Sequence, residues 1–130
     1  MGQQYLIDSN TVIDFLGGKL PASASAFMDK VVNDIPKVSV MTKIEVLGYN
    51  APPDSYQLLT DFMNASLVLD LSNEIVMKTI VLRKAHRIKT PDAIIAATAL
   101  VFNLTLLTGN TTDFKNVAGL QHLNPREIKK

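Results

Sequence analysis

A buried helix that leads into a strand is predicted by Thr90-Pro91-Asp92-Ala93-Ile94-Ile95-Ala96-Ala97-Thr98-Ala99-Leu100 and, after Asn103, by Leu104-Thr105-Leu106-Leu107. Threonine is a frequent N-cap residue and proline favours the first helical position, so we expect the helix to begin here. Little more than Asn103 joins the helix to the strand, so the helix must end at the amino edge of the sheet. Its first turn, with Asp92, therefore lies at the carboxyl edge.

Outward from this stretch, short apolar runs alternate with helical patterns along the chain. Strands are predicted over residues 4–7, 38–41, 67–69, 104–107 and 120–123, and helices over 11–16, 22–32, 42–47, 55–65, 72–86 and 90–100. Such alternation is typical of a parallel sheet covered by helices on both faces. We predict the α/β class, as a three-layer α/β/α sandwich with a mainly parallel five-stranded sheet, in a single domain over residues 1–130.

The composition excludes several kinds of site. The chain has 130 residues, 47% of them hydrophobic, and no cysteine, which excludes disulfides, thiolate zinc sites and a cysteine nucleophile. Its 13 basic and 12 acidic side chains give a net charge of +1, so no general attraction to nucleic acid or membrane is expected. No apolar run approaches the ~20 residues of a membrane helix, and we expect a cytoplasmic protein without membrane contacts.

Four acidic residues stand where predicted strands give way to helices, or in the first turn of a helix. Asp8 follows the first strand, Glu45 opens the helix after the second, Asp92 opens the buried helix, and Asp113 follows the fourth strand. Ligands of open α/β sheets gather at the carboxyl ends of the strands, near the point where the strand order reverses. Carboxylates gathered there repel one another unless a cation is bound. The pattern predicts a metal site, and hard oxygen ligands favour Mg²⁺ or Mn²⁺.

Each of these acids also has a purely structural interpretation. Thr42-x-x-Glu45 fits a capping box and Asn110-x-x-Asp113 fits another helix cap. Asp92 is favoured at the positive end of its helix, and Asp8 fits a turn. These interpretations stay open for each residue alone, but they do not explain why all four converge on one edge.

Three motifs resemble those of the PIN-domain ribonucleases, in particular the VapC-type toxins of bacterial toxin–antitoxin pairs. They are Leu6-Ile7-Asp8-Ser9-Asn10, Pro91-Asp92-Ala93-Ile94-Ile95-Ala96-Ala97-Thr98-Ala99, and Leu107-Thr108-Gly109-Asn110-Thr111-Thr112-Asp113-Phe114. Thr42-Lys43-Ile44-Glu45 is a fourth, less specific element. The resemblance runs the length of the chain.

The resemblance implies a function and a set of site residues. It implies that Mg²⁺ or Mn²⁺ is held by Asp8, Glu45, Asp92 and Asp113, with Asn10, Thr108 and Asn110 assisting. The implied activity is endoribonuclease cleavage, in which a metal-activated water hydrolyses an RNA phosphodiester. A cognate antitoxin protein and a homodimer are the implied partners. The chain departs from its relatives at Gly109, where many carry a basic residue.

Two surface features have a functional and a structural interpretation. The basic residues Lys78, Arg83, Lys84, Arg87 and Lys89 would serve as RNA phosphate contacts or simply form a solvated helix face. A set of apolar residues suits a dimer or antitoxin surface, or ordinary core packing. This set is Leu47, Tyr49, Leu58, Leu59, Phe62 and Met63.

Three other functions compete with metal-dependent RNA cleavage. The first is a non-catalytic PIN-like module that binds RNA or a protein. The second is a phosphatase of the haloacid-dehalogenase kind with Asp8 as nucleophile, but Asn10 stands where that motif carries a second aspartate. The third is a metal-independent nuclease that uses His86 and His122 as acid and base.

Overall fold

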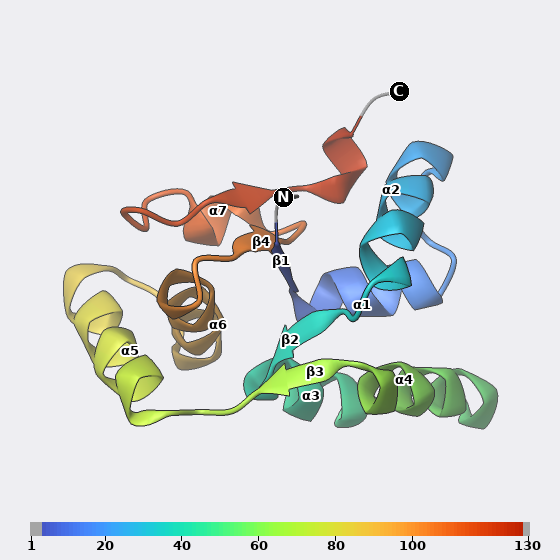
Figure 1. The fold of residues 1–130 in the computed structure, drawn as a ribbon, viewed down its shortest axis with the longest axis horizontal. Helices are drawn as coiled ribbons and strands as arrows, with labels where there is room; N and C mark the ends of the chain where they lie inside the picture. Colours follow the sequence, from blue (N-terminus) through green and yellow to red (C-terminus); the bar gives the residue numbers. More distant parts are fainter. Residues whose placement is uncertain (1–3, 129–130) are drawn as a thin grey trace.

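The computed structural model describes residues 4–128 and has the predicted α/β architecture (Figure 1). The strands are β1 Tyr5–Ile7, β2 Lys37–Ser39, β3 Leu67–Leu69, β4 Thr105–Leu107 and β5 His122–Leu123. The helices are α1 Ser9–Leu16, α2 Ala22–Asn33, α3 Val40–Leu47, α4 Pro53–Ala65, α5 Asn73–Ala85, α6 Thr90–Val101 and α7 Thr111–Phe114, with a 3₁₀ turn at Pro125–Glu127.

The five strands form two hydrogen-bonded groups, and every pairing between them is parallel. One group has the order β1-β4-β5, and the other pairs β2 with β3. Strand β2 also lies against β1, so the strands follow the spatial order β3-β2-β1-β4-β5. The order reverses between β1 and β4, which makes their carboxyl ends the place where a ligand site is expected.

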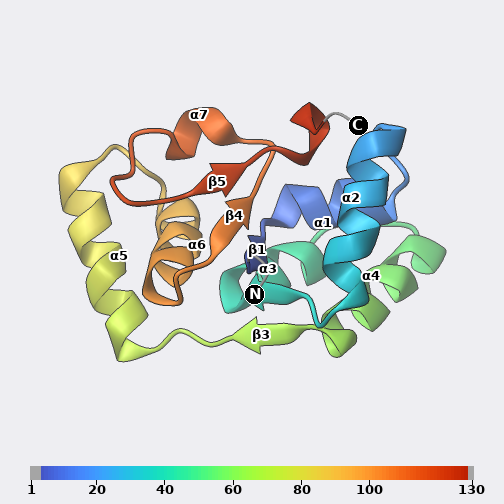
Figure 2. The same cartoon turned by 45° about the horizontal axis from the view of Figure 1, so that its top comes forward.

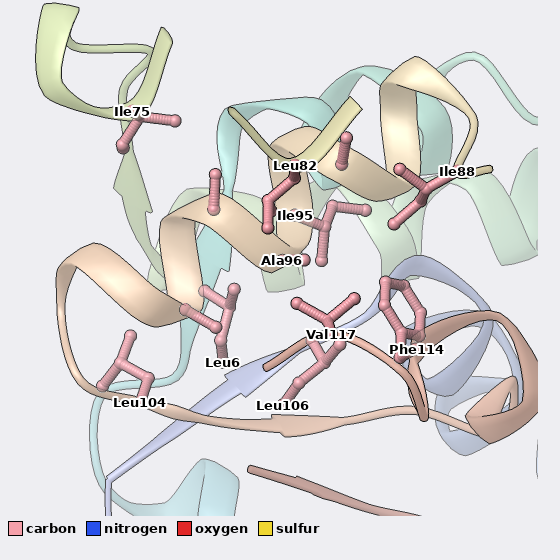
Figure 3. Close-up of a cluster of buried hydrophobic side chains, with 13 residues drawn as sticks. Leu6, Ile75, Leu82, Ile88, Ile95, Ala96, Leu104, Leu106, Phe114 and Val117 are labelled. Carbon is pink, nitrogen blue, oxygen red and sulfur yellow. The ribbon is translucent and has the colours of Figure 1, made fainter. Parts of the chain in front are cut away.

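Helices cover both faces of the sheet, which confirms the three-layer sandwich. Leu6 and Leu106 belong to a buried cluster with α5 and α6, shown in Figure 3. Their neighbours Ile7 and Leu107 belong to a second cluster with α1, α2, α3 and α4. Successive strand residues point to opposite faces, so β1 and β4 each contribute side chains to both clusters. Figures 1 and 2 both place the strands between α5–α6 on one side and α1–α4 on the other.

Helix α6 is the most deeply buried helix of the described chain, as its apolar sequence predicted. Ala93–Ala99 are all buried, and α6 packs along α5 and on the sheet. Its N-terminus differs slightly from the prediction, because Lys89 is the N-cap residue and makes no side-chain capping bond. Within α5, Ile75, Thr79 and Leu82 are buried, whereas Ile80 is exposed.

Side-chain caps shift the starts of two helices toward the N-terminus. Helix α1 begins at Ser9 with Asp8 as its N-cap, two residues before the predicted start at residue 11. Helix α3 begins at Val40, because the Ser39 hydroxyl accepts a hydrogen bond from the Met41 amide. Val40 and Met41 were predicted as strand residues, and that prediction was wrong. A cap hydrogen bond outweighs their β propensity here.

The chain shows no membrane-spanning feature in its described part. No helix within residues 4–128 has both the length and the apolar character needed to cross a bilayer.

Candidate active site and metal centre

Asp8 lies at the switch point between β1 and β4, and both of its carboxylate oxygens are held. Its backbone amide donates to the Leu107 carbonyl at 2.9 Å, which continues the β1–β4 pairing. Its side chain caps α1, with Oδ1 accepting from the Ser9 amide at 2.8 Å and Oδ2 from the Thr108 hydroxyl at 2.7 Å. The Asp8 side chain therefore has a fixed orientation at the end of the sheet.

Thr108 links the two strands that flank the switch point. It directly follows β4, is fully buried, and its hydroxyl donates to Asp8 while accepting from the Asn110 amide at 2.9 Å. The Thr108 hydroxyl therefore orients the Asp8 carboxylate. Asn10, in the first turn of α1, is exposed and lines the pocket described below.

Glu45 is held by a residue that the sequence reasoning did not single out. Its Oε1 accepts a hydrogen bond from the Ser9 hydroxyl at 2.6 Å, and that hydroxyl also lies 3.3 Å from the Thr42 hydroxyl. Because α3 begins at Val40, Glu45 lies in its second turn rather than its first. The capping-box interpretation of Thr42-x-x-Glu45 is therefore wrong, and Ser39 caps the helix instead.

The negative charges of the other three acids act on the carboxyl of Asp92. Asp92 is half-buried in the first turn of α6. Burial raises its pKa to about 6, and the negative charges of Asp8, Asp113 and Glu45 add to the rise, while Lys89 opposes it. The charges of all three other acids thus act on Asp92.

Asp113, like Glu45, is an exposed member of this cluster. It lies in the short helix α7, and its Oδ2 accepts from the Asn110 side-chain amide at 2.7 Å. Asn110 is the N-cap residue of α7 but makes no side-chain capping bond, so the simple cap interpretation of Asn110-x-x-Asp113 is wrong. Asn110 instead orients a member of the acid cluster.

Asp8 is an unfavourable place for an uncompensated charge. Burial raises the pKa of its carboxyl above the usual range, and the charge of Glu45 adds to this. The hydrogen bonds from Thr108 and the Ser9 amide lower the pKa and oppose the rise. A positive ligand next to Asp8 would relieve the same conflict.

Three of the four acids, but not Asp113, line a small open pocket of about 190 Å³, which we call the acid pocket. Its lining residues are Asp8, Ser9, Asn10, Ile13, Glu45, Tyr49, Asp92 and Asn110. Ser9, Ile13 and Tyr49 were not predicted as site residues. For Ser9, the only sequence signal was its place beside Asp8, because its contact with Glu45 depends on how α1 packs against α3.

The donor set fits a hard divalent cation, although the side chains do not form a closed cage. Within residues 4–128, no three His, Asp or Glu side chains are close enough to hold an ion as they stand. The one ion pair of the described chain, Arg126 with Asp14, lies outside the acid pocket. The clustered carboxylates thus lack an ion-paired partner, and oxygen donors of this kind suit Mg²⁺ or Mn²⁺.

The remaining candidate residues do not line the acid pocket. Of the predicted basic contacts, Lys89 acts on Asp92 through its charge, Arg83, Lys84 and Arg87 are exposed, and Lys78 lines a separate hollow on α5. His86 caps the end of α5 and His122 lies in β5, and neither lines the pocket.

The apolar set on α3 and α4 divides between core and surface. Leu59 and Met63 are buried in the second core cluster, so core packing accounts for them. Leu58 is 46% exposed and Tyr49 45% exposed, and both line a second hollow together with Leu16 and Pro52.

Comparison with known proteins agrees with the sequence motifs. The family model described as PIN domain matches residues 5–120. A toxin–antitoxin complex from Klebsiella pneumoniae contains a similar chain with 27% identity and a TM-score of 0.78, and the match covers 96% of this chain and 100% of that one. A search of curated proteins gives no match.

Two further structures share the fold at lower identity. For DNA-bound VapBC from Salmonella typhimurium the identity is 20%, the TM-score is 0.78, and the coverage is 95% and 99%. For VapBC2 from Rickettsia felis bound to a promoter DNA fragment, the identity is 20%, the TM-score is 0.79, and the coverage is 94% and 98%. Together with the match over residues 5–120, these similarities show that the chain belongs to the PIN-domain family, as its motifs around Asp8, Asp92 and Asp113 predicted.

Proposed function

We propose that this protein is a metal-dependent endoribonuclease and the toxin of a VapC-type toxin–antitoxin pair. The observation that carries the proposal is the acid cluster, in which carboxylates from four separate elements act on one another. Asp8, Glu45 and Asp113 all raise the pKa of Asp92. Such a cluster at the switch point of a PIN domain supports a site for phosphate chemistry.

Asp8, Glu45, Asp92 and Asp113 are the residues that would hold Mg²⁺ or Mn²⁺. When bound, the ion supplies an activated water and neutralises the charge that builds up on the phosphate. Thr108 and Ser9 keep Asp8 and Glu45 oriented before an ion arrives. The exposed side chain of Asn10 stands at the same pocket, where its amide is available to a phosphate oxygen.

The partner proteins are proposed from the relatives. The similar Klebsiella chain was solved as part of a toxin–antitoxin complex, and the match spans both chains almost completely. We therefore assign this chain a cognate antitoxin and the cytoplasm as its place of action. The exposed apolar side chain of Leu58 provides surface for that antitoxin or for a homodimer.

An RNA cleavage assay tests the proposed function. Total cellular RNA is incubated with the parent protein in Mg²⁺, in Mn²⁺ or in EDTA, and cleavage products are separated on a gel. We expect cleavage with either metal and none in EDTA. Asp8→Asn should lower the rate by at least about 100-fold, because it removes a central carboxylate of the metal site.

Asp70→Asn is a matched control for this assay. Asp70 also follows a strand directly, after β3, but is exposed and does not line the acid pocket. Full activity of Asp70→Asn together with loss in Asp8→Asn would support the assignment. Undiminished activity of Asp8→Asn would contradict it.

The same assay separates the competing functions. Cleavage that survives EDTA would favour acid–base catalysis by His86 and His122. Phosphate trapped covalently on Asp8 would favour the phosphatase, and RNA binding without turnover would favour a non-catalytic module.

A further inference from the structure

Tyr49 places an aromatic ring on the wall of the acid pocket. It lies just beyond the C-terminus of α3, where Gly48 ends the helix and the Tyr49 amide donates to the Val46 carbonyl at 3.3 Å. The side chain is 45% exposed and lines the pocket together with Asp8, Glu45 and Asp92. Within residues 4–128 its hydroxyl makes no hydrogen bond, so no hydrogen bond of the fold accounts for a tyrosine at this place.

The acid pocket thus has two chemically different walls. Asp8, Glu45 and Asp92 offer charged oxygens, whereas Ile13 and Tyr49 offer apolar surface. Carboxylates suit a cation and, through it, a phosphate, but they repel RNA on their own. The chain's net charge of +1 adds no general attraction. A contact that does not depend on charge would therefore add to the binding of RNA at this place.

A nucleobase on the ring of Tyr49 would supply that contribution. Bases of single-stranded nucleic acid stack on exposed aromatic side chains, and the interaction tolerates many sequences because every base has a flat face. The ring and the carboxylates line one pocket of about 190 Å³, so a base stacked on Tyr49 would lie near a phosphate held at the carboxylates.

We infer that Tyr49 is a substrate-binding residue that stacks on a nucleobase next to the scissile phosphate of single-stranded RNA. The inference rests on the proposed nuclease function and deepens it. The base that stacks on Tyr49 is unpaired, since a base held in a duplex has both faces covered by its neighbours.

Tyr49 also borders the second hollow, beside Leu16 and Leu58, which has a volume of about 200 Å³. That hollow contains none of the four acids of the cluster. A protein segment bound there would use the other side of the same ring, so the test has to distinguish RNA from a protein partner.

Kinetics of RNA cleavage give the first test. We expect Tyr49→Phe to behave like the parent, because the phenyl ring still stacks, and Tyr49→Leu to raise KM roughly tenfold, the loss of about one base–ring contact. The kcat of Tyr49→Leu should stay close to that of the parent, because the carboxylates are untouched.

Tyr56→Leu is the matched control for the kinetics. Tyr56 is also a partly exposed tyrosine, but it lies on α4, donates to the Leu47 carbonyl, and does not line the acid pocket. Its substitution should leave KM unchanged. An unchanged KM in Tyr49→Leu, with the parent active, would overturn the inference but not the proposed function.

Fluorescence gives a second test that does not require turnover. The chain contains no tryptophan, so Tyr49→Trp introduces a single reporter into the pocket. In an Asp8→Asn background with EDTA, where no cleavage is expected, single-stranded oligoadenylate should quench this tryptophan, and double-stranded RNA should quench it much less. Tyr56→Trp in the same background should not respond.

The absence of quenching at position 49 would overturn the inference and leave Tyr49 to a protein partner. Quenching in a protein whose parent form does not cleave RNA would support the base contact while contradicting the proposed nuclease activity. The two failures are thus distinguishable.

Discussion

A single serine connects two members of the acid cluster. The Ser9 amide donates to Asp8 and its hydroxyl donates to Glu45, so a residue without charge sets the relative placement of two carboxylates. This matters most for Glu45, because its side chain is exposed and makes no other hydrogen bond in the described chain. Without Ser9 the glutamate would lose its defined orientation and recover rotamer freedom.

We predict that Ser9→Ala weakens metal binding. One hydrogen bond to a charged group is worth ~1.5 kcal/mol, so the dissociation constant for Mn²⁺ should rise roughly tenfold. Isothermal titration calorimetry with Mn²⁺ measures it directly, and RNA cleavage at limiting metal should fall in parallel. Ser9→Thr keeps the hydroxyl and should retain most of the affinity.

Ser66→Ala provides the comparison for this loss. The Ser66 hydroxyl donates to the Phe62 carbonyl at the end of α4, away from the acid pocket. Its removal should lower stability slightly and leave Mn²⁺ affinity as in the parent. If Ser9→Ala binds Mn²⁺ as tightly as Ser66→Ala does, Ser9 has no positioning role.

The helices differ in how well their bounds could be predicted from the sequence. Helix α6 and strand β4 were predicted nearly to the residue, since a continuous apolar run has one stable environment, the space between α5 and the sheet. The starts of α1 and α3 were misplaced, because each depends on a side-chain cap, Asp8 or Ser39. Apolar periodicity does not reveal which polar residue turns back to bond its own helix.

Close packing of α6 yields a prediction at the same scale. Ala96 is fully buried and part of the cluster that joins α5, α6 and the sheet in Figure 3. Ala96→Leu should lower the free energy of unfolding by about 1–3 kcal/mol, because the larger side chain forces its neighbours apart. Denaturant unfolding followed by circular dichroism measures this value.

Ala85→Leu, at the exposed end of α5, is the control for Ala96→Leu. This substitution adds the same atoms at an exposed position, so it should change the free energy of unfolding by less than about 0.5 kcal/mol. Equal effects of the two substitutions would mean that α6 is not tightly packed.

At the scale of the whole molecule, convergence of the acids could be predicted but their environment could not. The direction of each element fixed which end of the sheet carries Asp8 and Asp92, and the parallel order β3-β2-β1-β4-β5 bears this out. The hydrogen bonds of Thr108 and Ser9, and the ring of Tyr49 on the pocket wall, depend on distances between helices. Those distances arise only when all three layers pack together.

The acid cluster should also make the stability of the metal-free protein depend on pH. The pKa of Asp92 is raised to about 6 from an ordinary value of 3.8, so between these values the folded chain binds more protons than the unfolded chain. Its contribution to stability is fully present below about pH 3.8 and is lost as the pH rises through about 6. Asp8, whose pKa is also raised, acts in the same direction.

Asp92→Asn isolates this effect, because the amide stays neutral at every pH. In EDTA at pH 7 we expect the variant to be more stable than the parent by ~1 kcal/mol. Each pKa unit of the rise from 3.8 to about 6 would correspond to about 1.4 kcal/mol without screening, and solvent reduces the total because Asp92 is half-exposed. The difference should vanish near pH 4. Added Mg²⁺ should reverse the order, because only the parent keeps all four carboxylates for the ion, and ligand binding stabilises the folded state. Thermal unfolding of both proteins across this pH range, with and without Mg²⁺, measures these three differences in stability. A variant that is less stable than the parent in EDTA at pH 7 would show that the clustered charges do not repel.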